Sequence, residues 1–520
     1  MPTHISPRLA LLILLIGGCV FLMGIGSLVL WRVHPQGGVS PLQKVAKNSL
    51  FPMVTSFLNK FLDLAFAVYM LPVLGPEGVG KYTYAVVVIG YLDILTNFGL
   101  GTLLTREVAR NRLSANRYLG NTLVLRIGLW ALSLPLLALL LGPGAGPMAI
   151  TPDVAMAILL LSLGLLPSLI SGALTSLFQA YERFEHPAIV TVLTSLLKIS
   201  LGVLALASGW GFVGLAAVSV VVNLVTLAVL GALVMALLMR PKPEFQPRFS
   251  WGLLRLAYPL MLNNLLNSLF FRVDSLMLKP MAGEAALGWY GTAYKFIDGL
   301  GVISSTFTLA LFPLFSQYAQ GARDQLARTF GFALKLMLII SLPICVGTTL
   351  IAPEIILLFA GPDYLPHSGY ALQILIWFLP FSFVNGVTQY LLIAINQQRF
   401  ITISFLIATA FNLATNLLLI PTLGYLGAAI TTVLSEWALM GPFWYCVRRH
   451  LPPIPVLSLA WRPTMASALM GLEVWALRDW SLPAAVMVAP LLYGALLFLL
   501  GTLSLEERAL LGRMAPWRKG

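Results

Sequence analysis

The sequence predicts an all-α polytopic membrane protein with two six-helix lobes, two further C-terminal helices and one extra N-terminal helix. Its composition, its hydrophobic runs and an internal repeat predict this architecture. Of the 520 residues, 59% are hydrophobic and only 10% are charged, and the mean hydropathy is +0.89. A soluble domain carries about 25% charged residues. The composition therefore argues against a soluble enzyme, a disordered chain, a collagen and an outer-membrane barrel built from alternating strands.

Fifteen hydrophobic runs are long enough to cross a bilayer, which takes about 20 apolar residues. The first run stands apart from the other fourteen. We expect it to be an uncleaved extra helix, with lipidation or cleavage as the alternative because residues 15–19 loosely resemble a lipoprotein box. The runs are residues 8–31, 46–73, 80–104, 119–142, 153–178, 188–208, 212–239, 252–278, 286–314, 329–352, 369–394, 400–420, 425–446, 456–477 and 483–503.

The basic residues predict how the chain is oriented. The net charge is +13, but most Lys and Arg lie in short loops that follow the odd-numbered runs. This alternation fits the positive-inside rule, so we interpret it as a topology signal and not as a nucleic-acid site. It predicts a multi-pass protein of the cytoplasmic (inner) membrane with a cytoplasmic C-terminus. The three cysteines imply no disulfide framework and the five histidines have no ligand spacing, so we expect no metal site.

Residues 46–239 and 252–446 resemble two copies of one unit. Asn59 to Tyr82 matches Asn267 to Tyr290 at an offset of 208, and Gly211 matches Gly424 at an offset of 213. Each copy holds six runs, which return the chain to the same side, so the lobes are predicted to be related by a pseudo-twofold along the membrane normal. The predicted domains are residues 1–38 (extra helix), 39–245 (N-lobe), 246–450 (C-lobe) and 451–520 (two helices and a basic tail).

Basic side chains lie inside several predicted spans, where a charge costs at least ~2.5–3.5 kcal/mol. Charges retained at this cost usually face a partner charge or a water-filled cavity. Their sign suits an anionic head group, and an arginine can bind phosphate through two parallel hydrogen bonds. We therefore predict that five of them bind substrate: Lys60, Arg126, Lys198, Arg272 and Lys295.

Acidic side chains accompany these cations. Asp63, Asp274 and Asp298 are predicted to line the same cavity, where they hold the cations in place or exchange H+ or Na+. The alternative is structural, because Lys60 with Asp63, and Lys295 with Asp298, are spaced for ion pairs within one helix. Asn412 and Asn416 are expected to make hydrogen bonds between helices.

Catalytic signatures are missing from the sequence. It contains no G-x-x-x-x-G-K-[ST] phosphate loop, no H-E-x-x-H and no G-x-S-x-G. The loops between the runs are also too short for a folded catalytic domain. We therefore expect a protein that is not an enzyme and that uses no cofactor.

Two stretches resemble a known family. Residues 97–110 (NFGLGTLLTREVAR) are similar to the end of the second core helix of oligosaccharide flippases in the polysaccharide-biosynthesis (Wzx-like) family. Residues 272–279 (RVDSLMLK) and 286–295 (ALGWYGTAYK) resemble that family's seventh and eighth core helices. The resemblance covers about residues 42–503, and the extra N-terminal span departs from the common pattern. The family belongs to a superfamily that also includes multidrug extruders and the lipid II flippase.

The resemblance implies a flippase for a cell-surface polysaccharide pathway. Such a protein moves an undecaprenyl-diphosphate-linked oligosaccharide between leaflets by alternating access, and Arg272, Asp274 and Lys295 are the residues that best match the family by position. Membrane lipid and the lipid-linked oligosaccharide are the implied partners, with a polysaccharide polymerase or glycosyltransferases of the same pathway as further ones. A proton- or sodium-coupled multidrug exporter and a lipid II-type flippase are the alternatives.

Overall fold

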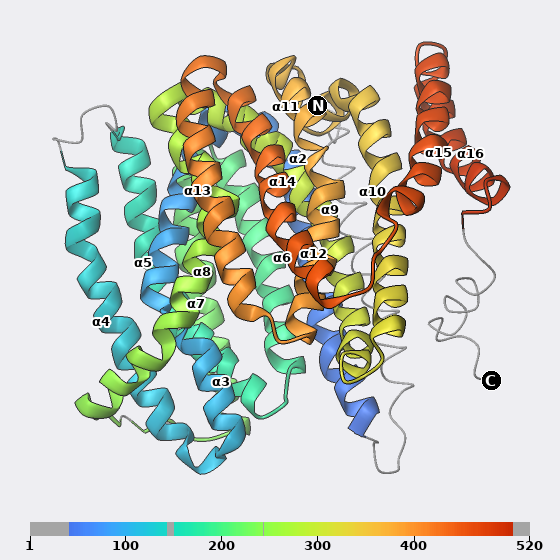
Figure 1. Ribbon diagram of the computed structural model, residues 1–520. Coiled ribbons are helices and arrows are strands. Elements are labelled where there is room, and N and C mark those ends of the chain that lie inside the picture. Colours follow the sequence, from blue (N-terminus) through green and yellow to red (C-terminus); the bar gives the residue numbers. More distant parts are fainter. Residues whose placement is uncertain (1–40, 143–149, 243, 503–520) are drawn as a thin grey trace. The chain divides into compact units, whose positions relative to one another are not determined.

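The computed structural model describes residues 41–142, 150–242 and 244–502, and within these ranges the chain is helical almost throughout, with no strand (Figure 1). The first part of the chain forms α2 (Pro41–Asn97), α3 (Leu100–Arg110), α4 (Ala115–Leu141), α5 (Pro152–Ala180), α6 (Glu185–Ala207), α7 (Gly211–Leu237) and α8 (Pro247–Ala282). The rest forms α9 (Glu284–Tyr318), α10 (Arg323–Phe359), α11 (His367–Leu375), α12 (Phe378–Ala394), α13 (Gln398–Leu423), α14 (Tyr425–His450), α15 (Val456–Leu477) and α16 (Leu482–Leu499).

The helices confirm the predicted all-α membrane fold. Each predicted span from residue 46 onward coincides with one or two of them, whereas the predicted span 8–31 and the basic tail lie outside the described residues. Ten helical segments of the described chain are long and apolar enough to cross a membrane. Large apolar side chains such as Leu132, Leu418 and Leu491 are more than two-thirds exposed. A bilayer would cover these side chains, so the chain is a multi-pass membrane protein.

Two predicted spans contain breaks that hydropathy does not reveal. Phe98 and Gly99 have positive φ angles of 52° and 72°, which separate α2 from α3. Gly99 lies against α8, where a Cβ atom would approach the Cβ of Leu260 to 2.7 Å. The other break separates α11 from α12, because Pro380 has no N–H for the carbonyl of Ile376. That carbonyl accepts from the backbone N–H of Leu379 at 3.1 Å and from Cys345 Sγ at 3.0 Å.

The internal repeat is visible in the backbone. Gly75 interrupts α2 with φ 65° and ψ 172°, and Gly283 separates α8 from α9 with φ 91° and ψ 173°. The two glycines are 208 positions apart, which is the offset seen in the sequence. Only glycine adopts this conformation readily. Gly211 and Gly424 also match, with φ angles of 57° and 59°, so the two copies share their turns as well as their hydrophobic pattern.

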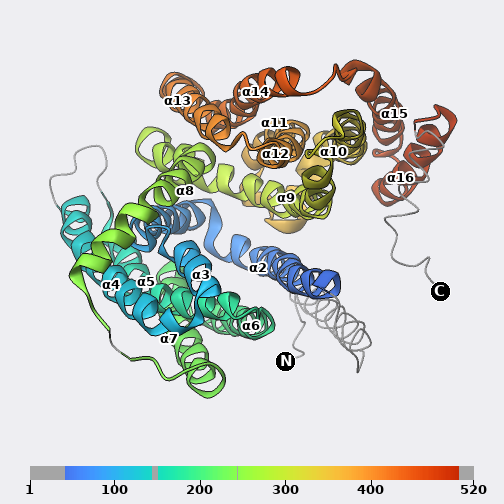
Figure 2. The same ribbon diagram turned by 60° about the horizontal axis from the view of Figure 1, so that its bottom comes forward.

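The chain forms two compact units. The first runs to Lys295 and includes Phe359–Tyr364, so it contains α8 and the start of α9 from the second sequence copy. In this unit α2 packs against α4, α5, α6, α7 and α8, and α5 packs along α7 (Figure 2). Phe178 and Leu177 of α5 are fully buried in its core with Val108 and Val234. The buried hydroxyl of Tyr364 donates to the Leu71 carbonyl at 2.7 Å, which ties the short segment to α2.

The second unit comprises Phe296–Leu358 and the chain after Leu365. In it α14 packs against α11, α12 and α13, and α15 packs against α16. Asn412 Nδ2 of α13 donates to Ser435 Oγ of α14 at 2.9 Å, which confirms the expected interhelical hydrogen bond. Asn416 instead donates to Asn412 within α13. Tyr493 of α16 donates to the carbonyl of Ile339 in α10 at 2.8 Å and so joins the last two helices to this unit.

Candidate functional site

The candidate site begins on α2, at charged residues far from the helix ends. At about 1.5 Å per residue, Lys60 lies roughly 22 Å along the helix from the turn at Gly75. By the same rise, Arg272 lies roughly 16 Å from the turn at Gly283, and Lys295 roughly 18 Å from it on the next helix. The hydrocarbon core of a bilayer is about 30 Å thick. These ionisable groups therefore lie within the membrane-spanning parts of their helices.

An ion pair joins α2 to α6 at this depth. Lys198 Nζ lies 3.5 Å from Asp63 Oδ1, and the two side chains are 42% and 61% exposed. Lys60 lies one turn before Asp63 on α2, and its side chain is exposed as well. Asp63 thus pairs with a lysine on another helix, and its predicted pairing with Lys60 stays a prediction. Two lysines and one aspartate give this group of residues an excess of positive charge, which attracts anions.

Arg272 and Asp274 lie together on α8 but have different surroundings. Asp274 is buried, and its carboxylate accepts hydrogen bonds from the Tyr290 hydroxyl and from the backbone N–H of Ser275. Arg272 is half-buried, and its Cζ atom lies 5.0 Å from the ring centroid of Tyr294. The ring attracts the guanidinium through a cation–π interaction, and an arginine is the residue best suited to bind phosphate through two hydrogen bonds.

The remaining predicted residues of the second copy lie on α9. Lys295 and Asp298 are both half-buried, and each interacts with other groups of the protein. Their ion pairing within the helix stays a prediction, as does their contact with substrate.

Arg126 differs from the other predicted cations because it is buried in helix packing. Its side chain is 1% exposed, and it donates to the Leu169 carbonyl of α5 at 2.5 Å and to Asn97 Oδ1 of α2 at 2.6 Å. Gly101 and Gly172 leave room for the guanidinium, since a Cβ at either position would lie 3.0–3.3 Å from its nitrogens. In this conformation Arg126 joins α2, α4 and α5.

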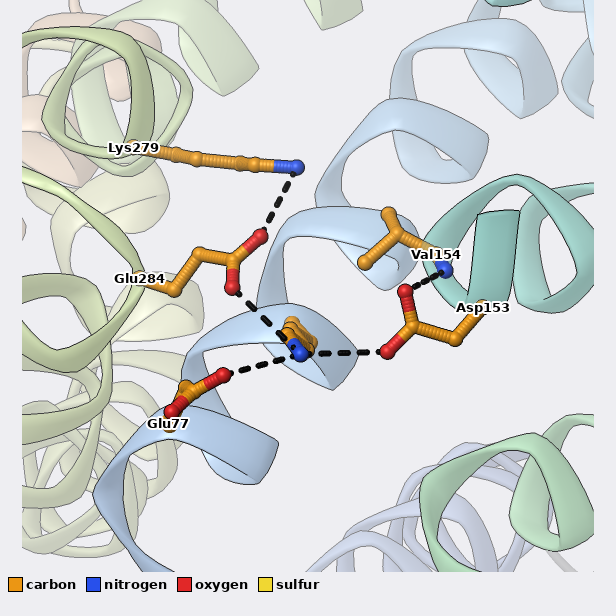
Figure 3. A network of polar contacts seen from close by, with 6 residues as sticks. Glu77, Asp153, Val154, Lys279 and Glu284 are labelled. Carbon is orange, nitrogen blue, oxygen red and sulfur yellow. Dashed lines mark hydrogen bonds and ion pairs between the residues drawn. The ribbon is translucent and has the colours of Figure 1, made fainter. Parts of the chain in front are cut away.

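A second polar cluster lies at the Gly75 end of α2, and we call it the lysine knot (Figure 3). Lys81 Nζ lies 2.9 Å from Glu77, 3.1 Å from Asp153 and 3.7 Å from Glu284. Glu284 also pairs with Lys279 at 3.3 Å. Figure 3 shows the three carboxylates converging from α2, from the start of α5 and from the start of α9. The knot therefore fastens the first hairpin of the second copy to the first copy.

Two glycines bring the backbones together beside the lysine knot. A Cβ on Gly80 would overlap the carbonyl of Glu284, and a Cβ on Gly288 would overlap the carbonyl of Pro76. Gly80 and Gly288 are 208 positions apart, as are Pro76 and Glu284, so the contact is reciprocal with respect to the repeat. Small residues allow this close approach of membrane helices.

Sequence reasoning missed the knot because it treated Lys81 and Lys279 only as loop charges. The signal was present in the acids Glu77, Asp153 and Glu284, which flank spans on the predicted side of both lysines. Among the described residues, no group of three His, Cys, Asp or Glu side chains is arranged to hold a metal ion.

Two family models match the chain. The model described as polysaccharide biosynthesis protein matches residues 45–319, and the MatE model matches residues 259–418. Among curated proteins, the lipid II flippase MurJ of Bacillus subtilis is 26% identical over 243 residues, which are 42% of this chain and 44% of MurJ. An uncharacterized membrane protein of Methanocaldococcus jannaschii is 29% identical over 163 residues, which are 31% of this chain and 32% of that protein. The chain thus spans less than half the length of these relatives.

Solved structures share the fold over nearly their whole length. A lipid II flippase MurJ in an inward closed conformation has a TM-score of 0.72 at 15% identity, covering 86% of this chain and 97% of that one. An inward-facing multidrug resistance MATE transporter of the MOP superfamily has a TM-score of 0.62 at 18% identity, covering 77% and 95%. At these identities the likeness establishes the fold. Because the polysaccharide biosynthesis model matches more than half of the 520 residues, the chain belongs to the polysaccharide biosynthesis protein family.

Proposed function

We propose that the protein is a flippase that moves an undecaprenyl-diphosphate-linked oligosaccharide across the cytoplasmic membrane for cell-surface polysaccharide synthesis. The observation that carries this proposal is the exposed group of Lys60, Asp63 and Lys198, which keeps charges at the depth of the hydrocarbon core. Membership of the polysaccharide biosynthesis protein family supports the saccharide part. The fold shared with the lipid II flippase supports a lipid-linked substrate.

The head group is held by charge in this proposal. Lys60 and Lys198 attract the diphosphate, and Arg272, stacked on Tyr294, binds it through its N–H edges. Lys295 adds a further cation from α9. Arg126 holds helices together in this conformation and would reach substrate only after α2, α4 and α5 separate. The lipid tail stays in the bilayer throughout, so only the oligosaccharide and its diphosphate have to pass through a water-filled pathway.

In this proposal the aspartates position the basic side chains and couple transport to an ion gradient. Asp63 holds Lys198 in place, and Asp274 is held by Tyr290. We propose that one of Asp63, Asp274 or Asp298 takes up H+ or Na+ during the cycle, because a carboxylate retained inside a span is costly without such a role. Collapse of both ion gradients would then slow transport.

Alternating access requires one end of the pathway to close while the other opens. The lysine knot and the reciprocal contact of Gly80 and Gly288 close the Gly75 end, which the charge pattern predicts to be the outer side. Several of the knot's side chains are partly exposed, so water can replace its ion pairs when the helices separate. With this orientation the C-terminus is cytoplasmic, close to the glycosyltransferases that make the substrate and on the side opposite the polymerase that uses it.

Two other functions have specific support. The 26% identity with the lipid II flippase of Bacillus subtilis favours lipid II as substrate. The MatE match over residues 259–418 favours a coupled exporter of small molecules.

A translocation assay in proteoliposomes tests these functions together. Fluorescent undecaprenyl-diphosphate oligosaccharide, lipid II and a cationic dye are each supplied, and the fraction protected from an impermeant quencher is followed with time. We expect the wild type to move the oligosaccharide faster than the other two. We expect Arg272→Gln to lose most of this activity and Arg323→Gln, an exposed arginine of α10, to keep it. Faster movement of lipid II or of the dye would replace the proposed substrate, and full activity of Arg272→Gln would remove Arg272 from the site.

A further inference from the structure

The chain between α7 and α8 is fastened across the start of α4 (Figure 2). The side chain of Asn116 accepts a hydrogen bond from the backbone N–H of Lys242 at 2.9 Å. Asn121 Oδ1 accepts from the backbone N–H of Gln246 and from the Ser250 hydroxyl, both at 2.8 Å. Gly120 permits the contact, because a Cβ there would lie 2.5 Å from the carbonyl oxygen of Glu244. Lys242, Glu244 and Gln246 of the connection are therefore held against the start of α4.

This connection forms one side of a pocket of about 650 Å³ that is widely open to the surface. The pocket is lined by Arg117, Phe245, Gln246, Pro247, Arg248 and Phe249. The ring of Phe249 holds the guanidinium of Arg117 at 4.0 Å from its centroid, and Tyr118 packs on that ring edge-on at 5.0 Å. We name it the arginine pocket.

The two arginines of this pocket have hydrogen-bonding capacity that the protein does not use. Within the part of the chain that the structure describes, neither guanidinium has a hydrogen-bond or ion-pair partner, although Glu244 lies only four positions before Arg248. In contrast, the nearby Arg106 and Arg110 both pair with Glu107, at 2.8 Å and 3.5 Å. An unpaired pair of guanidinium groups beside aromatic rings is suited to a phosphate.

The surroundings of the arginine pocket indicate that its ligand also has an apolar part. Phe245 in the pocket is 54% exposed, and Leu113, four positions before Arg117 and just ahead of α4, is 97% exposed. Trp251, two positions after Phe249, is 60% exposed and carries Arg255 at 5.7 Å from its ring centroid. Exposed aromatic and basic side chains side by side are typical of the membrane interface. A soluble phosphate or an acidic peptide would use the arginines and leave these apolar side chains in water.

We propose that the arginine pocket binds the head group of an anionic phospholipid, with Arg117 and Arg248 on the phosphate and the acyl chains along the exposed apolar side chains. The charge pattern predicts this end of the helices to be cytoplasmic, where anionic lipids give the membrane a negative surface. The bound lipid holds the connection between the two predicted lobes against α4. The pocket lies at the start of α8, roughly 36 Å along that helix from Arg272 of the translocation site.

Native mass spectrometry of the full-length protein in detergent tests this proposal. Bound lipid is counted while dioleoylphosphatidylglycerol, or neutral dioleoylphosphatidylcholine, is added. We expect the protein with Arg117→Gln and Arg248→Gln to bind the anionic lipid on the order of 30-fold more weakly. Each lost arginine–phosphate hydrogen bond weakens binding by about 1 kcal/mol, and about 1.4 kcal/mol corresponds to a tenfold change in affinity. The control combines Arg323→Gln and Arg328→Gln, two exposed arginines of α10 with the same loss of charge, and it keeps wild-type affinity.

Several outcomes would overturn the proposal. Equal binding of both lipids would show that the head-group charge does not matter. An equal loss of affinity for the anionic lipid in the pocket variant and in the control would show that general surface charge, and not the pocket, binds the lipid. Wild-type affinity in the pocket variant would place the lipid elsewhere. Displacement of the lipid by millimolar glycerol phosphate or by polyglutamate would assign the pocket to a soluble anion or to an acidic peptide. Because the readout is lipid binding, none of these results depends on whether the protein transports oligosaccharide.

Discussion

At the scale of single residues, burial separates two kinds of intramembrane charge. Arg126 is buried and donates to two neighbouring helices, whereas Asp63 and Lys198 form an exposed pair. The sequence alone places all three residues inside spans, because their depth in the membrane is predicted from their distance to the span ends. The sequence does not show how each helix is rotated about its axis. That rotation decides whether a side chain faces water or another helix.

The buried arginine predicts a loss of stability. Arg126→Ala removes the guanidinium whose two terminal nitrogens donate to Asn97 Oδ1 and to the Leu169 carbonyl, and it leaves a cavity. Each buried group left without its partner costs about 1–3 kcal/mol, so we expect a clear fall in the unfolding temperature in nanodiscs. Arg323→Ala, on the exposed surface of α10, serves as the control. An unchanged unfolding temperature for Arg126→Ala would show that its contacts contribute nothing to the fold.

The exposed ion pair of Asp63 and Lys198 predicts a loss of transport with little loss of stability. Asp63→Asn breaks a pair of the kind that contributes about 0–1 kcal/mol, so the unfolding temperature should barely change. Transport of lipid-linked oligosaccharide should fall severalfold, because Lys198 loses the group that positions it. Asp479→Asn is the matched control, since it breaks an exposed pair with Arg478 of the same 3.5 Å length beyond the end of α15. Equal transport by both variants would make the Asp63 pair incidental.

At the scale of helices, hydropathy predicts spans well and their ends poorly. Each predicted span from residue 46 onward is helical because about 20 apolar residues in a row satisfy both the bilayer and the helix. The break between α11 and α12 follows from Pro380, a residue that the sequence shows. The break at Gly99 was missed because it depends on the packing of α8 on Gly99. Such contacts leave no trace in a hydropathy window.

The reciprocal glycine contact gives a prediction at this scale. Gly80→Ala forces α2 away from the start of α9, and overpacking of this kind costs typically about 1–3 kcal/mol. Gly288→Ala should behave alike, because its surroundings are the repeat equivalent. Gly90→Ala on the same helix should be neutral, since nothing lies within 4 Å of the added atom. We would measure the unfolding temperatures; a loss for Gly90→Ala as large as that for Gly80→Ala would contradict the packing argument.

At the scale of the whole molecule, the internal repeat was predictable and the composition of the compact units was not. The offset of 208 that aligns Asn59 with Asn267 also relates the turns at Gly75 and Gly283. The predicted lobe boundary at residues 245–246 follows the repeat, whereas the first compact unit continues to Lys295. The reason is physical: the lysine knot and the glycine contact fasten the second copy's first hairpin to the first copy. The predicted lobe boundaries stay a prediction about moving parts.

The central claim is that charged side chains at mid-span face water and hold a diphosphate head group, and thiol labelling of Lys60→Cys tests it most directly. The variant is made with Cys19, Cys345 and Cys446 replaced by Ser, and Leu132→Cys, an exposed apolar position of α4, is the lipid-facing control. We predict that a hydrophilic thiol reagent modifies position 60 rapidly, that lipid-linked oligosaccharide slows this reaction, and that position 132 stays unmodified. Labelling at position 60 as slow as at position 132 would contradict the account, because Lys60 would then face lipid or dry helix contacts.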